Sequence, residues 1–436
     1  MNIRQQLKQS IKCGTGKAYF IVQDNPTIDF YKDITKAALT NFAHDPQVEG
    51  DRAHYAAQLI NLSNKKEKII ECVLQTLATE RQDTWVLDQL FELATIFAKN
   101  GDKKARQAIY KRYHKKVING SKWCGQDAIV EIDGIEGLKF IAKIRGKALI
   151  KNPDDWEDSF FVDHFQKENP KIKVYEELEK ASKNNSHIKN YLSTIKKHKW
   201  STYRRQQRSK FNYKRVKENI EKMVVVPASP FGIRELTKSD IKRLANDFFQ
   251  EKVPIKQEKY LRIFAHTKFP YDYSQILQIA KGQNSRNNRL VEYACKALSF
   301  FEANDIRQFA IKKISKTNTP SDYLPLLVSN YKKGDNKLLA KIADRFKDEN
   351  IIHDLVWGYI DIYKSNKTKE CKRPLEIIYD KLTCGLHRCD IIEILYENGV
   401  LSNRILKEIE FDSYDETRKL NKKYKKNSFQ KRTKRR

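Results

Sequence analysis

Apolar residues recur along this chain at the spacing of an α-helix, and no other feature limits the possible folds as strongly. Between Asp83 and Asn100 they are separated by steps of three and one, which places them on one helix face. Asp83 is expected to cap that helix, and Asn100-Gly101 to end it in a left-handed turn. Asp102 can then cap the next helix, so we predict a helical hairpin. The apolar positions are Leu87, Leu90, Phe91, Ala94, Phe97 and Ala98, followed by Ala105, Ala108, Ile109 and Tyr113.

The same pattern returns in the C-terminal half. Apolar stripes over 290–301, 306–314, 324–331 and 338–346 predict four further helices, the third of them opened by Pro320-Ser321-Asp322. Helix starts therefore fall roughly every 13–20 residues and helix pairs every 30–40. That period is typical of solenoids, in which each helix pair buries its apolar stripe by stacking on its neighbours.

Composition supports helices over strands. Glycine (15) and proline (11) together make up 26 of 436 residues, about half the usual combined share of roughly 12%. Few tight turns are therefore available for a β-sandwich or barrel. Hydrophobic residues make up 40% of the chain, which is enough to build cores. We predict an all-α solenoid with these parts: helical block 1–198, basic connecting segment 199–236, helical block 237–417 and disordered basic tail 418–436.

Positive charge is concentrated in two short segments. The chain carries 85 basic and 55 acidic residues, a net charge of +30. Residues 181–222 hold 13 basic and two acidic residues, and residues 418–436 hold 11 basic residues and no acidic ones, so together they supply 22 of the 30 net charges. Such an excess favours a polyanionic partner, nucleic acid before anionic lipid. The alternative is a solvated linker and tail without a dedicated ligand.

Aromatic rings, including Phe211 and Tyr213, lie among the cations of the midsection. Lysine and arginine neutralise phosphates, and planar rings stack on unpaired bases. Alternatively, the rings anchor a basic helix on the protein while its charges stay in water. The residues that we expect to contact nucleic acid are Lys196, Lys197, Lys199, Trp200, Tyr203, Arg204, Arg205, Arg208, Lys210, Lys214, Arg215, Lys431, Arg432, Lys434, Arg435 and Arg436.

Two tryptophan–aspartate pairs are candidates for catalysis. Trp123 precedes Asp127 by four residues, and Trp357 precedes Asp361 by the same step. On a helix, each pair would share one face. The pairs resemble those of HEAT-like alkylpurine DNA glycosylases, in which the ring cradles a nucleoside and the carboxylate stabilises positive charge on the sugar. Core packing of the tryptophans is the favoured explanation, because five tryptophans yield such pairs by chance.

Several stretches are similar to a widespread group of bacterial HEAT-repeat domain proteins. Arg307, two residues after Asp305, also resembles the HEAT pattern. The resemblance covers most of residues 15–200 and 280–418, and it implies a HEAT-like α-solenoid without transferring any catalytic residue. The similar stretches are 51–55 through 68–71, 83–91, 131–138, 152–156 and 389–400.

The cysteines show no usual metal motif. Cys384, His387 and Cys389, with Cys371 upstream, are zinc-type ligands, but on one helix the first three would face different directions. We therefore expect buried thiols, no metal and no cofactor. Scattered cysteines, the lack of an apolar signal segment and the lack of a run of ~18 apolar residues favour a cytoplasmic protein.

These observations favour a non-catalytic HEAT-repeat scaffold that binds nucleic acid through the midsection and tail. A solenoid of this kind usually acts by binding, and a protein partner on its surface is expected as well. The enzyme alternative is a HEAT-like DNA glycosylase. A third alternative is a protein–protein adaptor without a role on nucleic acid. The sequence leaves DNA versus RNA and the oligomeric state open.

Overall fold

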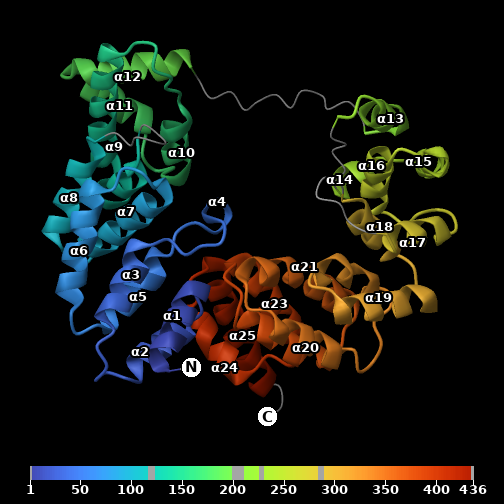
Figure 1. The fold of residues 1–436 in the computed structure, drawn as a ribbon. Helices are drawn as coiled ribbons and strands as arrows, with labels where there is room; N and C mark the ends of the chain where they lie inside the picture. The colour runs from blue at the N-terminus through green and yellow to red at the C-terminus, as the bar shows by residue number, and fades with distance from the viewer. Residues whose placement is uncertain (1, 116–122, 199–210, 225–229, 283–288, 434–436) are drawn as a thin grey trace. The chain divides into compact units, whose positions relative to one another are not determined.

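The computed structural model describes residues 2–115, 123–198, 211–224, 230–282 and 289–433, and its fold is all-α (Figure 1). The described residues form α-helices and short 3-10 helices, and no strand occurs among them. The prediction of an all-α fold is therefore confirmed. The chain divides into two compact units, Met1–Gln207 with Phe411–Ser413 (unit 1) and Arg208–Glu410 with Tyr414–Arg436 (unit 2).

Unit 1 contains the first twelve helices. They are α1 (Ile3–Cys13), α2 (Lys17–Gln23), α3 (Tyr31–Leu39), α4 (Pro46–Glu49), α5 (Ala53–Leu62), α6 (Lys66–Thr79), α7 (Thr84–Lys99), α8 (Lys103–Tyr113), α9 (Gln126–Lys151), α10 (Phe160–Glu168), α11 (Val174–Lys183) and α12 (Ser186–Lys197). Helix α7 packs against α5, α6, α8 and α9, and α6 and α8 lie side by side (Figure 1).

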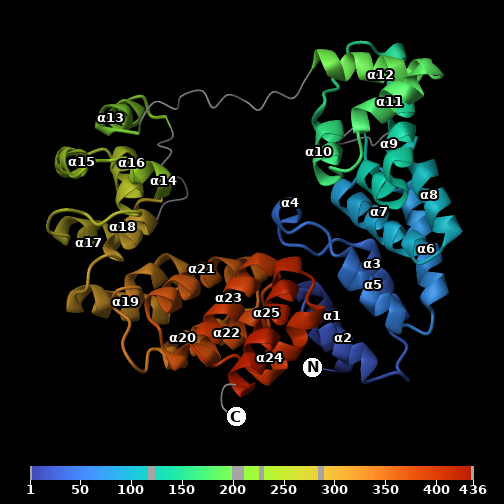
Figure 2. The same ribbon diagram turned by 180° about the vertical axis from the view of Figure 1, so that it is seen from behind.

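Unit 2 follows with shorter elements. They are α13 (Tyr213–Glu221), α14 (Pro230–Ile233), α15 (Lys238–Gln250), α16 (Pro254–Phe264), α17 (Ser274–Ala280), α18 (Leu290–Leu298), α19 (Asn304–Lys316), η1 (Pro320–Asp322), η2 (Leu324–Leu327), α20 (Asn336–Arg345), α21 (Glu349–Ser365), η3 (Lys369–Cys371), α22 (Lys372–Tyr379), α23 (Gly385–Glu397), α24 (Asn403–Glu408), η4 (Ile409–Phe411) and α25 (Asp415–Thr433). Within this unit, α20, α22, α23 and α25 pack in succession (Figure 2).

The predicted hairpin is present as α7 and α8. The Asp83 carboxylate accepts hydrogen bonds from the backbone N–H groups of Trp85 and Val86, and so caps α7. Gly101 has φ +95°, the left-handed conformation that glycine adopts without strain. Asp102 caps α8 in the same way as Asp83 caps α7. Two caps and one glycine thus set the chain reversal that brings α8 against α7.

The predicted helix over 320–331 is wrong in type. Two 3-10 helices, η1 and η2, occupy residues 320–327. Pro325 lies in the first turn of η2 and has no backbone N–H to continue an α-helical ladder. The apolar side chains of this stretch are nevertheless buried, as the periodicity predicts; they are Leu324, Leu326 and Leu327.

Part of the predicted connecting segment is a packed helix. Helix α13 buries Val216 and Ile220, and Phe211 just before it is also buried. The Tyr213 hydroxyl donates a hydrogen bond to the Asp247 carboxylate at 2.9 Å. Residues 211–221 are therefore not an exposed connection and fit the alternative expectation that the aromatic rings anchor a basic helix, because Val216 and Ile220, four residues apart, supply an apolar stripe among the lysines.

The start of the predicted disordered tail is also helical. Leu420 and Tyr424 of α25 are buried, and the Tyr424 ring stacks on Tyr396 of α23 with centroids 3.7 Å apart. Asp415 also pairs with Lys419 at 3.0 Å in the first turns of the helix. The prediction of disorder is therefore wrong for residues 419–424, because two well-spaced apolar side chains are enough to fix a helix on a neighbouring surface.

Helices α9 and α12 approach each other closely at a glycine. A β-carbon added to Gly146 would collide with the backbone carbonyl of His187. The Asn190 side-chain amide donates a hydrogen bond to the Gly146 carbonyl oxygen at 3.1 Å. Close backbone contact of this kind fixes the crossing of the two helices.

Among the helices that the structure describes, none combines the length and the apolar character needed to cross a bilayer.

Candidate functional site

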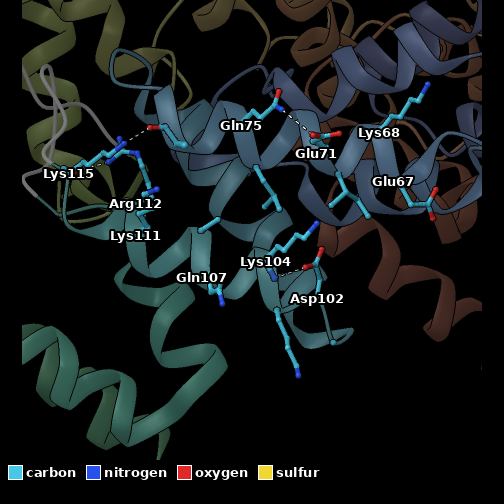
Figure 3. Close-up of a pocket in the computed structure, with 16 residues that line it drawn as sticks. Glu67, Lys68, Glu71, Gln75, Asp102, Lys104, Gln107, Lys111, Arg112 and Lys115 are labelled. Atoms are coloured by element: carbon cyan, nitrogen blue, oxygen red, sulfur yellow. Dashed lines mark hydrogen bonds between the residues drawn. The ribbon is translucent and has the colours of Figure 1, made fainter.

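A groove between α6 and α8 in unit 1 has a volume of about 980 Å³ (Figure 3). We call it the lysine groove. Its apolar lining comes from both helices: Ile70, Leu74, Ala78 and Ala108. The charged side chains come mainly from α8 and from the first turn of α6. The groove therefore combines apolar contact area with a charged lining.

Five lysines supply the positive charge of the groove: Lys68, Lys103, Lys104, Lys111 and Lys115. In the part of the chain that the structure describes, none of them forms an ion pair with a carboxylate. Other lysines of unit 1 are paired, such as Lys65 with Asp29 at 2.6 Å and Lys99 with Glu131 at 2.5 Å. Carboxylates therefore do not neutralise the groove lysines, although the Lys115 ammonium also donates a hydrogen bond to the Ala78 carbonyl oxygen.

The acidic side chains of the groove do not neutralise these lysines. The Asp102 carboxylate accepts hydrogen bonds from the backbone N–H groups of Lys104 and Ala105, at 2.8 and 3.1 Å. Glu71 accepts a hydrogen bond from the Gln75 side chain at 3.4 Å (Figure 3). Glu67 is the third acidic residue of the lining. The groove therefore carries more positive than negative charge.

Buried hydrogen bonds hold one end of the groove in place. The Arg112 guanidinium is 2% exposed and donates to the carbonyl oxygens of Glu80 and Lys115, each at 2.7 Å. The Lys115 ammonium donates to the Ala78 carbonyl oxygen at 3.1 Å. These bonds tie the end of α8 to the end of α6. Because a preformed groove loses less conformational entropy on binding, this anchoring favours ligand binding.

Unit 1 also carries a cluster of acidic residues on α7 and α9. The pKa of Asp88 is raised to about 6, because the surrounding protein desolvates the carboxylate and Asp51 and Asp127 repel its charge. The pKa of Glu92 is raised to about 7, by desolvation first and then by Glu131 and Asp51. This cluster would repel a polyanion, whereas the groove between α6 and α8 would attract one.

The two predicted tryptophan–aspartate pairs differ in the structure. Trp123 lies before α9, and Gly125 between it and Asp127 has φ +87°, so the prediction that this pair shares a helix face is wrong. Trp357 and Asp361 both lie on α21, and the Trp357 side chain is 54% exposed. Burial raises the pKa of both Asp127 and Asp361.

Trp123 lines a second pocket of about 290 Å³, together with Trp156 and Arg145. We call it the tryptophan pocket. The buried Arg145 guanidinium pairs with Glu157 at 2.5 Å, and it also hydrogen-bonds the Gln126 side chain and the Tyr113 hydroxyl. Two indole rings with a fixed ion pair can hold a flat ligand by stacking. The sequence pattern did not single out Trp156 or Arg145 for this site.

Most of the predicted nucleic-acid residues lie outside the described residues. The exceptions include Lys196 and Lys197 at the end of α12 in unit 1, and Lys214 and Arg215 on α13 in unit 2. Lys196 pairs with Glu179 at 2.7 Å, and Lys197 and Lys214 are exposed. The residues outside the described ranges are Lys199, Trp200, Tyr203, Arg204, Arg205, Arg208, Lys210, Lys434, Arg435 and Arg436, and those of α25 for which only the backbone is described are Lys431 and Arg432.

Sequence reasoning missed the lysine groove because it weighed charge by segment. Residues 66–115 hold ten basic and seven acidic residues, so the excess over the whole stretch is small, although residues 103–115 alone hold six basic residues and no acidic ones. The informative signal is the spacing of Lys104 and Lys111, which lie seven residues apart and so return to a similar position around α8.

Comparisons of the chain with protein-family models, with curated proteins and with solved structures give no significant match. The fold and the site together define a class of protein. It is all-α, and one of its two units carries a groove whose lysines form no ion pair with a carboxylate among the described residues. A function must therefore be argued from the geometry of that groove.

Proposed function

We propose that this chain is a HEAT-like solenoid scaffold that binds a polyanion, nucleic acid before other polyanions, and that the lysine groove is part of the binding surface. The observation that carries the proposal is the set of five groove lysines without a carboxylate partner. The basic segments 181–222 and 418–436 add to the same affinity. The seven free cysteines support a cytoplasmic location, where thiols stay reduced.

The spacing of the lysines suits an extended anionic ligand. Lys104 and Lys111 lie about 10 Å apart along α8 at the helical rise of 1.5 Å per residue. Lys68 contributes a further charge from α6. A ligand that lies along the groove can therefore meet several ammonium groups at once, and each phosphate neutralised in this way releases counterions into solution.

Salt-dependent binding tests this proposal. Labelled duplex DNA, single-stranded DNA and RNA are titrated with nucleic-acid-free protein, and binding is followed by fluorescence anisotropy. The full chain is compared with a chain ending at Tyr424, which keeps the buried Leu420 and Tyr424 of α25. If all five groove lysines contact duplex phosphates, the shorter chain retains a log–log salt slope of magnitude about 4–5. Loss of all binding with the tail would refute a role for the groove.

The glycosylase alternative has one structural observation in its favour, the tryptophan pocket. Two indole rings and the Arg145–Glu157 ion pair line a space large enough for one nucleobase. Asp127, the carboxylate that the sequence pair suggests, is not part of the pocket lining, whose acidic residues are Asp155 and Glu157. This alternative predicts release of alkylated bases from DNA and loss of that release in Asp127→Asn or Asp361→Asn. The acidic residues around Asp88 and Glu92 count against it, since they repel a DNA strand.

The adaptor alternative is favoured by the apolar lining of the lysine groove, from Ile70 to Ala108. An acidic amphipathic helix would cover such a groove with its apolar face and pair its carboxylates with the lysines. Nuclease-insensitive capture of one stoichiometric protein, lost when Leu74 is changed to Asp, would support the adaptor over the nucleic-acid scaffold. The matched control is Leu62→Asp, which makes the same change at a leucine outside the groove.

A further inference from the structure

Three side chains with metal-binding atoms meet in unit 2. They are His353 on α21, Cys384 just before α23, and His387 in the first turn of α23. One potential ligand atom from each lies within 4.8 Å of those of the other two. The Cys384 Sγ and His387 Nδ1 atoms are 3.1 Å apart. We call these three residues the His–Cys cluster.

The start of α23 brings Cys384 and His387 together. Cys384 is the N-cap residue, with φ −72° and ψ 117°, so its side chain is not bound to the angular spacing of the helix. His387 follows one turn later, which lets the thiol and the imidazole meet. The sequence prediction that these side chains face different directions is therefore wrong for this pair, because it placed Cys384 inside the helix.

Neighbouring side chains hold the cluster in position. The Trp357 ring packs edge-on against His387 with centroids 4.2 Å apart, and the His353 ring lies 5.0 Å from His387. The buried Arg388 guanidinium donates to the carbonyl oxygens of Leu382 and Thr383 at 3.2 Å, next to Cys384 in the chain. These contacts fix the chain just before Cys384 and the imidazole of His387. The thiol and this imidazole would supply two of the ligand atoms.

We propose that the His–Cys cluster binds a zinc-type divalent metal ion. One thiolate and two imidazoles are the donor types that Zn²⁺ prefers, and they come from two packed elements, α21 and α23. Ligand bonds of about 2.0–2.3 Å to a tetrahedral ion place the ligand atoms roughly 3–4 Å from one another. Small side-chain rotations reach that spacing from the arrangement observed.

The burial of the cluster suggests an ion with one open coordination position. Cys384 and His387 are 4% and 3% exposed, whereas His353 is half-buried at the surface. Solvent can therefore reach the ion from the His353 side. Three protein ligands with a fourth position for water or a small anionic ligand is the arrangement of non-structural zinc sites. Binding would also release the Cys384 thiol proton, because the thiolate is the ligand.

Cobalt titration tests this proposal, because Co²⁺ takes tetrahedral zinc sites and absorbs visible light. Full-length, tag-free protein is stripped with a chelator and titrated with Co²⁺ alone. We expect saturation at one equivalent, a thiolate-to-cobalt charge-transfer band, tetrahedral d–d bands, and displacement by Zn²⁺. Quenching of tryptophan fluorescence by Co²⁺, lost in Trp357→Phe, would place the ion beside α21.

Matched variants separate the cluster from adventitious binding. Cys384→Ser should abolish the charge-transfer band, and His353→Gln should weaken Co²⁺ binding about 100-fold or more. Cys389→Ser changes a thiol five residues along the same helix and should leave the titration unchanged. No saturable bands in the wild-type protein, or equal bands in Cys384→Ser, would overturn the proposal. If Cys384→Ser does not fold, His353→Gln decides, since His353 is only half-buried and its replacement is expected to disturb the fold less.

Discussion

Arg307 on α19 donates hydrogen bonds from both terminal nitrogens to the Asp335 carboxylate, at 2.6 and 2.7 Å. One of these nitrogens also donates to the Asn330 carbonyl oxygen at 2.6 Å. Asp335 further accepts a hydrogen bond from the backbone N–H of Lys332 at 2.8 Å. The pair thus joins α19 to the turn before α20, and the side chains are only 17% and 10% exposed. Arg307 is the position that resembles the HEAT pattern in the sequence.

We predict that Arg307→Ala lowers the free energy of unfolding by about 2–4 kcal/mol, because it leaves a buried carboxylate without its cation. Urea unfolding followed by circular dichroism measures the change. The matched control is Arg289→Ala, which removes an exposed arginine paired with Glu292 in the same helical turn. That control should cost less than about 1 kcal/mol. Equal losses for both variants would contradict the structural role of the Arg307–Asp335 pair.

Gly146 gives a second test of packing, in unit 1. We predict that Gly146→Ala lowers the free energy of unfolding by about 1–3 kcal/mol, because the added β-carbon meets the His187 carbonyl and forces α9 and α12 apart. Thermal unfolding of the variant measures the effect. Lys147→Ala, at the exposed next position, should be near neutral. A stabilising effect of Gly146→Ala, as helix propensity alone would give, would show that the helices do not approach closely here.

Glu92 predicts a pH dependence of stability with a defined sign. Its pKa in the folded protein is about 7, above its usual 4.5. Between these values the folded chain holds a proton that the unfolded chain has lost, so stability falls as pH rises through this window. Glu92→Gln should therefore stabilise the protein by about 1–2 kcal/mol at pH 8 and have little effect at pH 4.

Glu177 provides a control of opposite sign for this experiment. Hydrogen bonds from Lys180 and Lys139 lower the pKa of Glu177, so its contribution to stability is present near neutral pH and is lost as pH falls. Urea midpoints at a series of pH values compare Glu177→Gln with Glu92→Gln. A Glu92→Gln effect that does not vary with pH would contradict the raised pKa.

The sequence predicted local structure well where a single residue type decides it. Asp83 and Asp102 cap their helices because a carboxylate can reach the backbone N–H groups of the first turn, and Gly101 tolerates the left-handed turn. The start of α25 was missed, and α13 was expected only as one of two alternatives, because their few apolar residues, such as Val216 and Tyr424, stand among many lysines. Their burial depends on a partner surface from distant parts of the chain, which no local pattern contains.

The candidate sites were harder to predict than the helices. Lys104 and Lys68 line one groove from two different helices, so the groove follows from packing, and charge totals taken by segment do not reveal it. His353 and Cys384 are 31 positions apart in the sequence and meet only because α21 packs on α23. The tryptophan–aspartate pairs were suggested by a spacing that brings two side chains together only on a helix. Trp123 lies before α9, so the spacing does not apply to its pair.

The most direct test of the central claim is charge reversal in the lysine groove. Lys104→Glu combined with Lys111→Glu reverses two exposed lysines of α8, and Lys337→Glu combined with Lys341→Glu makes the same charge change on α20 in unit 2. Anisotropy titrations with duplex DNA and RNA compare both variants with wild type. We predict that the affinity of the groove variant falls about tenfold or more and that the magnitude of its log–log salt slope falls by about two. The affinity and the slope of the α20 variant should change little. Equal losses for both variants, or none for either, would show that the lysine groove does not bind nucleic acid.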